Sequence, residues 1–231
     1  MRPLSYLQTG DFQGFLMQLL YILPAIVIAI SFHEAAHAWM SNKMGDSTAK
    51  NLGRVTLDPT KHFDVMGLIT FILLGFGWGK PVPTNPRNYH NYKKANVLVA
   101  LAGVTMNLVI GIVTAIIICI LIVTGVFSIT GSNVGNMSIV SIIHTILFYI
   151  ASINLVLCFF NLIPVPPLDG HHLVKGYIAR MSPNFYMNYQ RYGFILLIIV
   201  LYATPLGSYI STLVMWILQG IAGLFGLPFV I

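Results

Sequence analysis

The chain has 231 residues, of which 57% are hydrophobic and only 8% are charged, and its mean hydropathy is +0.82. Soluble domains carry about 25% charged residues, so this composition excludes a soluble enzyme or binding module and indicates a polytopic membrane protein. The net charge of +6 could suggest a nucleic-acid partner. The basic residues are instead placed as topology anchors, so we expect the lipid bilayer as a partner and no nucleic acid.

The apolar runs predict an all-α polytopic membrane protein, a transmembrane helix bundle. Three full spans are expected at about 14–41, 96–124 and 140–163. Two further runs, 192–204 and 207–226, are separated by a proline and a glycine and form either two tilted spans or a helical hairpin. We therefore expect one integral membrane domain over 1–231, with a core at 15–180 and C-terminal helical spans at 192–226. We expect no cleaved signal peptide and no soluble domain at either end.

The apolar piece at 67–78 is too short to span the membrane as a helix. Both of its flanks are basic, so it is expected to be re-entrant, and its β-branched and Gly-rich composition favours an extended or hairpin (β) structure. Such a segment is tolerated at membrane depth only inside protein or along a wet cavity. We expect residues 70–80 to offer a strand edge to an unwound substrate peptide.

Eleven of the twelve Lys and Arg residues lie in three windows, 43–61, 80–94 and 175–191, whereas the 125–137 loop carries no charge. By the positive-inside rule the three windows face the cytoplasm and the 125–137 loop faces outward. The first span therefore runs from the outside to the cytoplasm.

The first span ends in His33-Glu34-Ala35-Ala36-His37, an H-E-x-x-H motif. Residues i and i+4 of a helix share a face, so His33 and His37 can offer two imidazole nitrogens to one metal ion. Glu34 flanks that face, where it can take a proton from a metal-bound water. Zinc suits this ligand set, since a catalytic zinc takes three protein ligands and one water. Ionisable groups in a membrane segment are costly and therefore functional by default.

A third ligand is predicted at Asp169, which follows three prolines at the end of the third span. Pro-Pro-Leu-Asp-Gly also suits an ordinary surface turn. Because Asp169 and the H-E-x-x-H motif are assigned to the same cytoplasmic side, however, the carboxylate is the expected partner of the two histidines. A helix that breaks at membrane depth is a common way to build a polar site.

Together, the H-E-x-x-H motif and the segment 161–170, Asn-Leu-Ile-Pro-Val-Pro-Pro-Leu-Asp-Gly, resemble the site-2 protease (M50) family of intramembrane zinc metalloproteases. The segments 45–59 and 77–83 resemble its compact prokaryotic branch, which lacks PDZ and CBS domains. The resemblance covers about 15–180. It implies one zinc ion per chain held by His33, His37 and Asp169, with Glu34 as general base and Asn161 as a polar residue steadying the oxyanion or the substrate.

The resemblance also implies regulated intramembrane proteolysis in a prokaryotic cell membrane, with the active site toward the cytoplasm. The expected substrate is a transmembrane protein, either a single-span regulator or a remnant signal peptide. The sequence predicts no oligomeric state.

The chain departs from the family pattern at two places: Val104 stands where the family commonly has proline, and His171-His172 follow the aspartate and glycine. We expect both histidines to be interfacial residues, and His62, His90 and His144 to be structural. Two other functions remain open on the residues alone. One is a zinc or ion transporter, although the outer halves of the spans offer few polar groups. The other is a non-catalytic zinc-binding membrane scaffold, against which an open fourth coordination position argues.

Overall fold

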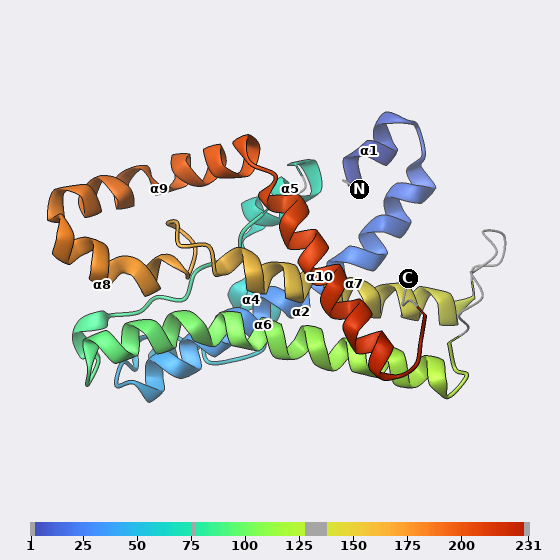
Figure 1. Cartoon of the computed structure of the whole chain (residues 1–231), viewed down its shortest axis with the longest axis horizontal. Coiled ribbons are helices and arrows are strands. Elements are labelled where there is room, and N and C mark those ends of the chain that lie inside the picture. The colour runs from blue at the N-terminus through green and yellow to red at the C-terminus, as the bar shows by residue number, and fades with distance from the viewer. Residues whose placement is uncertain (1–2, 75–76, 128–137, 229–231) are drawn as a thin grey trace.

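The computed structural model describes residues 3–74, 77–127 and 138–228, and this part of the chain is almost entirely helical (Figure 1). The helices are α1 (Pro3–Gln8), α2 (Phe12–Lys43), α3 (Thr48–Asn51), α4 (Pro59–His62), α5 (Val65–Leu74), α6 (Tyr92–Val123), α7 (Ile139–Asn161), α8 (His171–Met181), α9 (Pro183–Ala203) and α10 (Leu206–Leu224), with one 3-10 turn at Pro86–Asn88. No β-strand occurs within the described ranges. The all-α prediction is therefore confirmed.

Four of the described helices, α2, α6, α7 and α10, are long and apolar enough to cross a membrane. The first three correspond to the three predicted full spans. The two C-terminal runs form separate helices, but α9 begins in the polar segment 183–191 and does not meet the same criterion. The chain is thus a multi-pass membrane protein.

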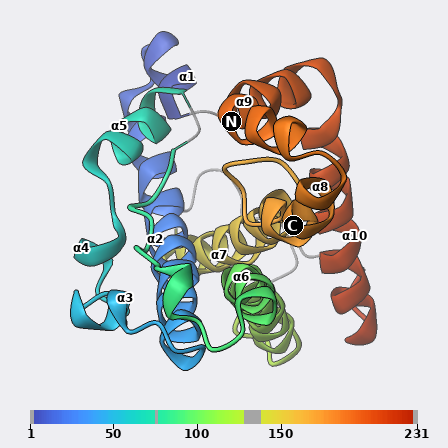
Figure 2. The same cartoon turned by 90° about the vertical axis from the view of Figure 1, so that its left-hand side faces the viewer.

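Helices α2, α6 and α7 all contact one another, and α10 packs across α6 and α7 (Figures 1 and 2). Helices α6 and α7 approach each other closely at Gly111, where a Cβ atom would stand 2.7 Å from the Leu155 side chain. A residue without a side chain at this position therefore permits close helix contact. The apolar core that results lies between α6, α7 and α10 and includes Ile118, Leu155 and Val214.

The prediction of an extended structure at 67–78 is wrong for most of the segment, because Val65–Leu74 forms helix α5. The Asp64 side chain caps this helix by accepting a hydrogen bond from Gly67 N at 2.9 Å. A helix satisfies its own backbone groups in apolar surroundings, which outweighs the weak β preference of a few branched residues. At 1.5 Å per residue α5 is about 15 Å long, so it cannot cross a hydrocarbon core of about 30 Å.

Consequently residues 70–74 offer no strand edge, and residues 75–76 lie outside the described part of the chain. Only the short stretch after them is extended: Gly79 forms an isolated antiparallel bridge with Phe63, and Lys80 N donates to His62 O at 2.7 Å. Re-entry of this segment into the bilayer stays a prediction.

Two buried charged residues hold loop 77–90 against the C-terminal end of α2. The Asp46 side chain is fully buried and accepts hydrogen bonds from Asn85 N at 2.6 Å and from Asn88 Nδ2 at 2.9 Å. Arg54 donates to two backbone carbonyls of the same loop, Lys80 O at 2.6 Å and Pro81 O at 3.2 Å. The loop is thus held at two places, and the residues between them are fixed over α2.

Replacing Asp46 by Asn should destabilise the protein in a pH-dependent way. Burial alone would raise the pKa of Asp46, but the hydrogen bonds from Thr48, Asn85 and Asn88 outweigh it and lower the pKa to about 2. A lowered pKa means that the carboxylate stabilises the fold near neutral pH, by about 2 kcal/mol, and that this stability is lost as pH falls from about 4 to 2. Thermal melts in detergent should show a gap between wild type and Asp46→Asn that closes over this pH range.

Asp58→Asn is the matched control, because Asp58 is exposed and caps α4, a position at which Asn serves about as well as Asp. A gap of equal size for both variants, or one that does not depend on pH, would contradict this role for Asp46.

Candidate metal centre

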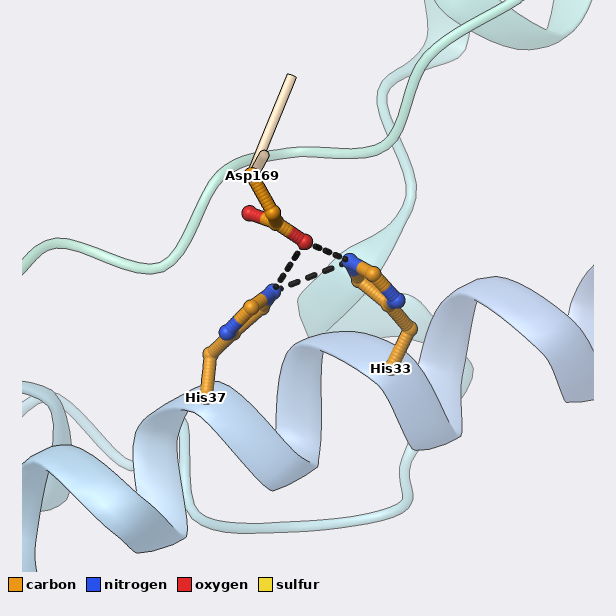
Figure 3. Close-up of side chains that lie close together, drawn as sticks. All are labelled: His33, His37 and Asp169. Carbon is orange, nitrogen blue, oxygen red and sulfur yellow. Dashed lines mark hydrogen bonds and ion pairs between the residues drawn. The ribbon is translucent and has the colours of Figure 1, made fainter. Parts of the chain in front are cut away.

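The two histidines of the first span point from one face of α2 toward the same spot (Figure 3). His33 Nε2 and His37 Nε2 lie 2.9 Å apart, and both side chains are largely buried. Their spacing of one helical turn places the imidazoles side by side, as the i, i+4 pattern predicts.

Asp169 reaches the same spot from the chain segment that follows α7. Its Oδ2 atom lies 3.1 Å from His33 Nε2 and 3.2 Å from His37 Nε2. The turn that carries it is closed by a hydrogen bond from Gly170 N to Asn161 O, 2.6 Å long. Gly170 packs so closely on the Leu162 carbonyl that any side chain at position 170 would collide with it. The predicted meeting of the two motifs is therefore found in the fold.

The orientation of the histidines depends on α6, which lies against them. His37 Nδ1 lies 2.7 Å from the carbonyl oxygen of Val99, and because a carbonyl only accepts, Nδ1 is the protonated nitrogen. The lone pair of His37 is therefore on Nε2, which faces His33 and Asp169. One turn further along α6, Gly103 has no side chain where a Cβ atom would stand 2.5 Å from His37 Nε2 and 2.6 Å from His33 Cε1.

The three atoms fit a zinc ion. A triangle with sides of 2.9–3.2 Å is small enough for one ion to reach every corner at the zinc bond length of about 2.0–2.1 Å. With Nδ1 protonated, His37 directs a lone pair at His33 Nε2 and at a carboxylate oxygen, an arrangement that a shared cation stabilises. Among the described residues, His33, His37 and Asp169 are the one group of three or more His, Cys, Asp or Glu side chains with this geometry.

Glu34 lies beside this group and is held by loop 77–90. Its Oε2 accepts a hydrogen bond from Val82 N at 3.0 Å. The prolines on either side of Val82 have no N–H, so Val82 supplies the single donor of the Pro-Val-Pro segment. The loop thus fixes the carboxylate that the sequence predicts to be the general base.

A cavity of about 450 Å³ opens over these four residues. It is walled by α2, loop 77–90, α6, the end of α7 and the start of α8. Asn161, the fifth predicted site residue, lines the cavity, and its Nδ2 donates one hydrogen bond to Leu157 O at 3.0 Å.

Three contributors to the site were not predicted from the sequence. Gly103 has no side chain that could mark a site, and the Val99 carbonyl gives no sequence signal at all. Asn107 is fully buried on the cavity wall, and neither polar atom of its amide has a hydrogen-bond partner within the part of the chain that the structure describes. Since buried amides are normally hydrogen-bonded, this side chain is suited to meet water or substrate. An Asn about four turns inside an apolar helix was the available clue.

The remaining histidines have other partners. His62 is fully buried and donates from Nε2 to Thr56 O at 2.8 Å, and His171 donates from Nδ1 to Leu168 O at 2.7 Å. His144 stacks edge-on against Phe127. His172 alone of these lines the cavity, where its Nδ1 lies 3.0 Å from Asn96 Oδ1.

Comparison with known proteins gives one family. The model of peptidase family M50 matches residues 21–201. YwhC of Bacillus subtilis (strain 168), named a candidate zinc metalloprotease, is 35% identical over 190 residues, covering 82% of this chain and 83% of the relative. Rip2 of Mycolicibacterium smegmatis, with the same description, is 23% identical over 93% of this chain and 76% of its own length. No solved structure matches the chain.

Replacing Gly103 by Ala should weaken metal binding, because the added methyl group displaces both imidazoles. We expect the affinity for zinc to fall on the order of 10- to 100-fold, as it does when groups that orient metal ligands are removed. Zinc titration of the detergent-purified protein against a competing chelator measures this. Gly220→Ala is the matched control, since a Cβ atom there meets nothing within 4 Å. Equal affinities in both variants would show that Gly103 does not set the imidazole positions.

Proposed function

The chain belongs to peptidase family M50, the site-2 protease family of membrane metalloproteases, and we propose that His33, His37 and Asp169 hold its zinc ion, one per chain. The observation that carries this assignment is the meeting of three ligand atoms, from α2 and from the turn after α7, within 2.9–3.2 Å of one another. Three protein ligands leave a fourth position open, which is the arrangement of catalytic rather than structural zinc.

A zinc ion held by these three residues would lower the pKa of a bound water and polarise the scissile carbonyl. Glu34 is the proposed general base: its carboxylate takes the proton from the attacking water and then delivers it to the leaving amine. The Val82 N–H holds one oxygen of this carboxylate and leaves the other to act on the proton. Asn161 is the proposed donor that steadies the oxyanion or the substrate, through the amide hydrogen that Leu157 does not take.

The proposed substrate is a transmembrane protein, a single-span regulator or a remnant signal peptide, cut within or near its span. A spanning helix pairs its own backbone amides, so the scissile bond must unwind before it can enter the cavity. The membrane setting of α2 and the polar cavity over its end support such a substrate. The family assignment favours this hydrolase over the transporter and the scaffold.

The proposed roles of Glu34 and Asp169 are tested by zinc content and cleavage together. Asp169→Ala should lose most of the approximately one zinc per chain, whereas Glu34→Gln should keep it. Glu34→Gln should reduce cleavage of co-expressed, epitope-tagged single-span proteins by roughly 10²- to 10⁴-fold, the usual contribution of a general base. Asp58→Ala, at an exposed aspartate, should change neither. Full zinc content in Asp169→Ala would remove this residue from the ligand set.

The active site is proposed to face the cytoplasm of a prokaryotic cell, since the three basic windows surround it in sequence. Single cysteines introduced into a variant with Cys119 and Cys158 replaced test this. An impermeant maleimide added to intact cells should label Val126→Cys, which is exposed in the loop after α6, and should label Leu57→Cys only after the membrane is opened. The reverse labelling would place the site outside.

A further inference from the structure

One face of α6 carries three residues that line the cavity, Asn96, Val99 and Asn107. Tyr92, Asn96, Val99, Gly103 and Asn107 recur at spacings of three and four, so they lie in one row along the helix. The inner part of this row serves the metal centre, through the Val99 carbonyl and the Gly103 gap. The outer part, Tyr92 and Asn96, faces helix α8 and has no role in that centre.

Two contacts connect this outer part to α8. Asn96 Nδ2 donates to His172 O at 3.3 Å, and His172 Nδ1 lies 3.0 Å from Asn96 Oδ1. Further out, the ammonium of Lys175 lies 5.6 Å from the centre of the Tyr92 ring. Residues 172 and 175 share a face of α8, so the Asn96–His172 pair fixes the turn from which Lys175 extends. Both His172 and Lys175 line the same cavity as the metal centre.

Lys175 brings an unbalanced positive charge to this wall. The two acidic side chains that line the cavity are already engaged, Asp169 by the histidines and Glu34 by Val82 N. Among the described residues Lys175 forms no ion pair; its partners are the hydroxyls of Tyr92 and Tyr186. Burial lowers its pKa, but these tyrosines outweigh the effect and raise it, so the side chain stays an ammonium ion.

We propose that Lys175 binds a carboxylate of the substrate and so determines specificity, with Asn96 and His172 positioning it. This inference rests on the proposed protease function and names a feature of its substrate. The carboxylate comes either from an Asp or Glu side chain or from a free C-terminus. A half-buried ammonium whose tyrosine partners are neutral gains most from such an anion, because hydrogen bonds between charged groups are the strong ones.

The row on α6 also gives the distance from the scissile bond. Seven residues separate Tyr92 from Val99 and eleven separate it from Gly103, so the Lys175 contact lies about 10–16 Å along α6 from the metal centre. An extended peptide advances about 3.3 Å per residue. The bound carboxylate therefore belongs three to five residues from the bond that is cut, on one side of it.

Binding of a peptide panel tests this proposal without requiring turnover. The full-length, zinc-loaded Glu34→Gln protein in detergent is titrated with fluorescent single-span peptides that differ only in one Glu, Gln or Lys, placed at successive positions through the span. Fluorescence anisotropy gives each Kd. At one position we expect the Glu peptide to bind about tenfold more tightly than the Gln peptide. A second arm compares peptides that end at this position as a free acid or as an amide, which separates a side-chain carboxylate from a C-terminal one.

Changes at position 175 should alter this charge preference and leave the zinc content unchanged. Lys175→Met should bring the Glu-to-Gln ratio to about one, Lys175→Arg should keep it, and Lys175→Glu should shift the preference to the Lys peptide. Lys93→Met, at an exposed lysine one residue from Tyr92, is the control for general electrostatic attraction and should keep the ratio. A variant that merely misfolds would lose binding to all peptides and would not reverse the charge preference from the Glu peptide to the Lys peptide, as Lys175→Glu should.

An unchanged ratio in Lys175→Met, or no Glu preference at any position, would overturn the proposal. So would a Lys175→Met variant that binds every peptide normally but binds vesicles containing phosphatidylglycerol less well, since Lys175 would then serve a lipid headgroup. A failure of the proposed protease function would give a different result. If wild type cuts none of the peptides while the charge preference is present, the carboxylate subsite stands and the proposed protease function of the site does not.

Discussion

The structure depends on one buried contact, the meeting of two imidazole nitrogens and one carboxylate oxygen beside the C-terminal half of α2. Ionisable side chains within a membrane segment are costly to bury. Within an apolar bundle they are stable only if they satisfy one another or bind a metal. The surrounding residues hold these three groups together. The turn that carries Asp169 is closed by the hydrogen bond from Gly170 N to Asn161 O. Helix α6 supplies the Val99 carbonyl, which binds His37, and Gly103, which leaves space for both imidazoles.

Helix α6 carries as much of the site as the helix with the H-E-x-x-H motif, although it contributes no metal ligand. In one row of α6 residues, the Val99 carbonyl orients the His37 imidazole and Gly103 leaves room for both imidazoles. The same row ends at Tyr92, whose ring lies next to Lys175 of α8. Loop 77–90 completes the site from the opposite side by holding Glu34. Because Asp46 and Arg54 fix this loop at two places, the position of Glu34, the proposed general base, depends on residues outside the membrane spans.

Features with a strong local pattern could be predicted from the sequence. The three long spans, the shared face of His33 and His37, and the nearby position of Asp169 follow from hydropathy, helical spacing and the break after three prolines. Helix α5 was wrongly predicted as extended, because a short apolar run of branched residues does not distinguish a strand from a helix. The parts contributed by backbone atoms or by missing side chains, such as the Val99 carbonyl and Gly103, depend on tertiary contacts that no local pattern encodes.

X-ray absorption at the zinc edge of the zinc-loaded protein tests the central claim most directly. The account predicts a first shell of nitrogen and oxygen only, at about 2.0–2.1 Å, with the multiple scattering of two imidazoles. A third imidazole would bring His171 or His172 into the shell, and a sulfur at about 2.3 Å would bring in a cysteine. Either result would contradict a site built from His33, His37 and Asp169.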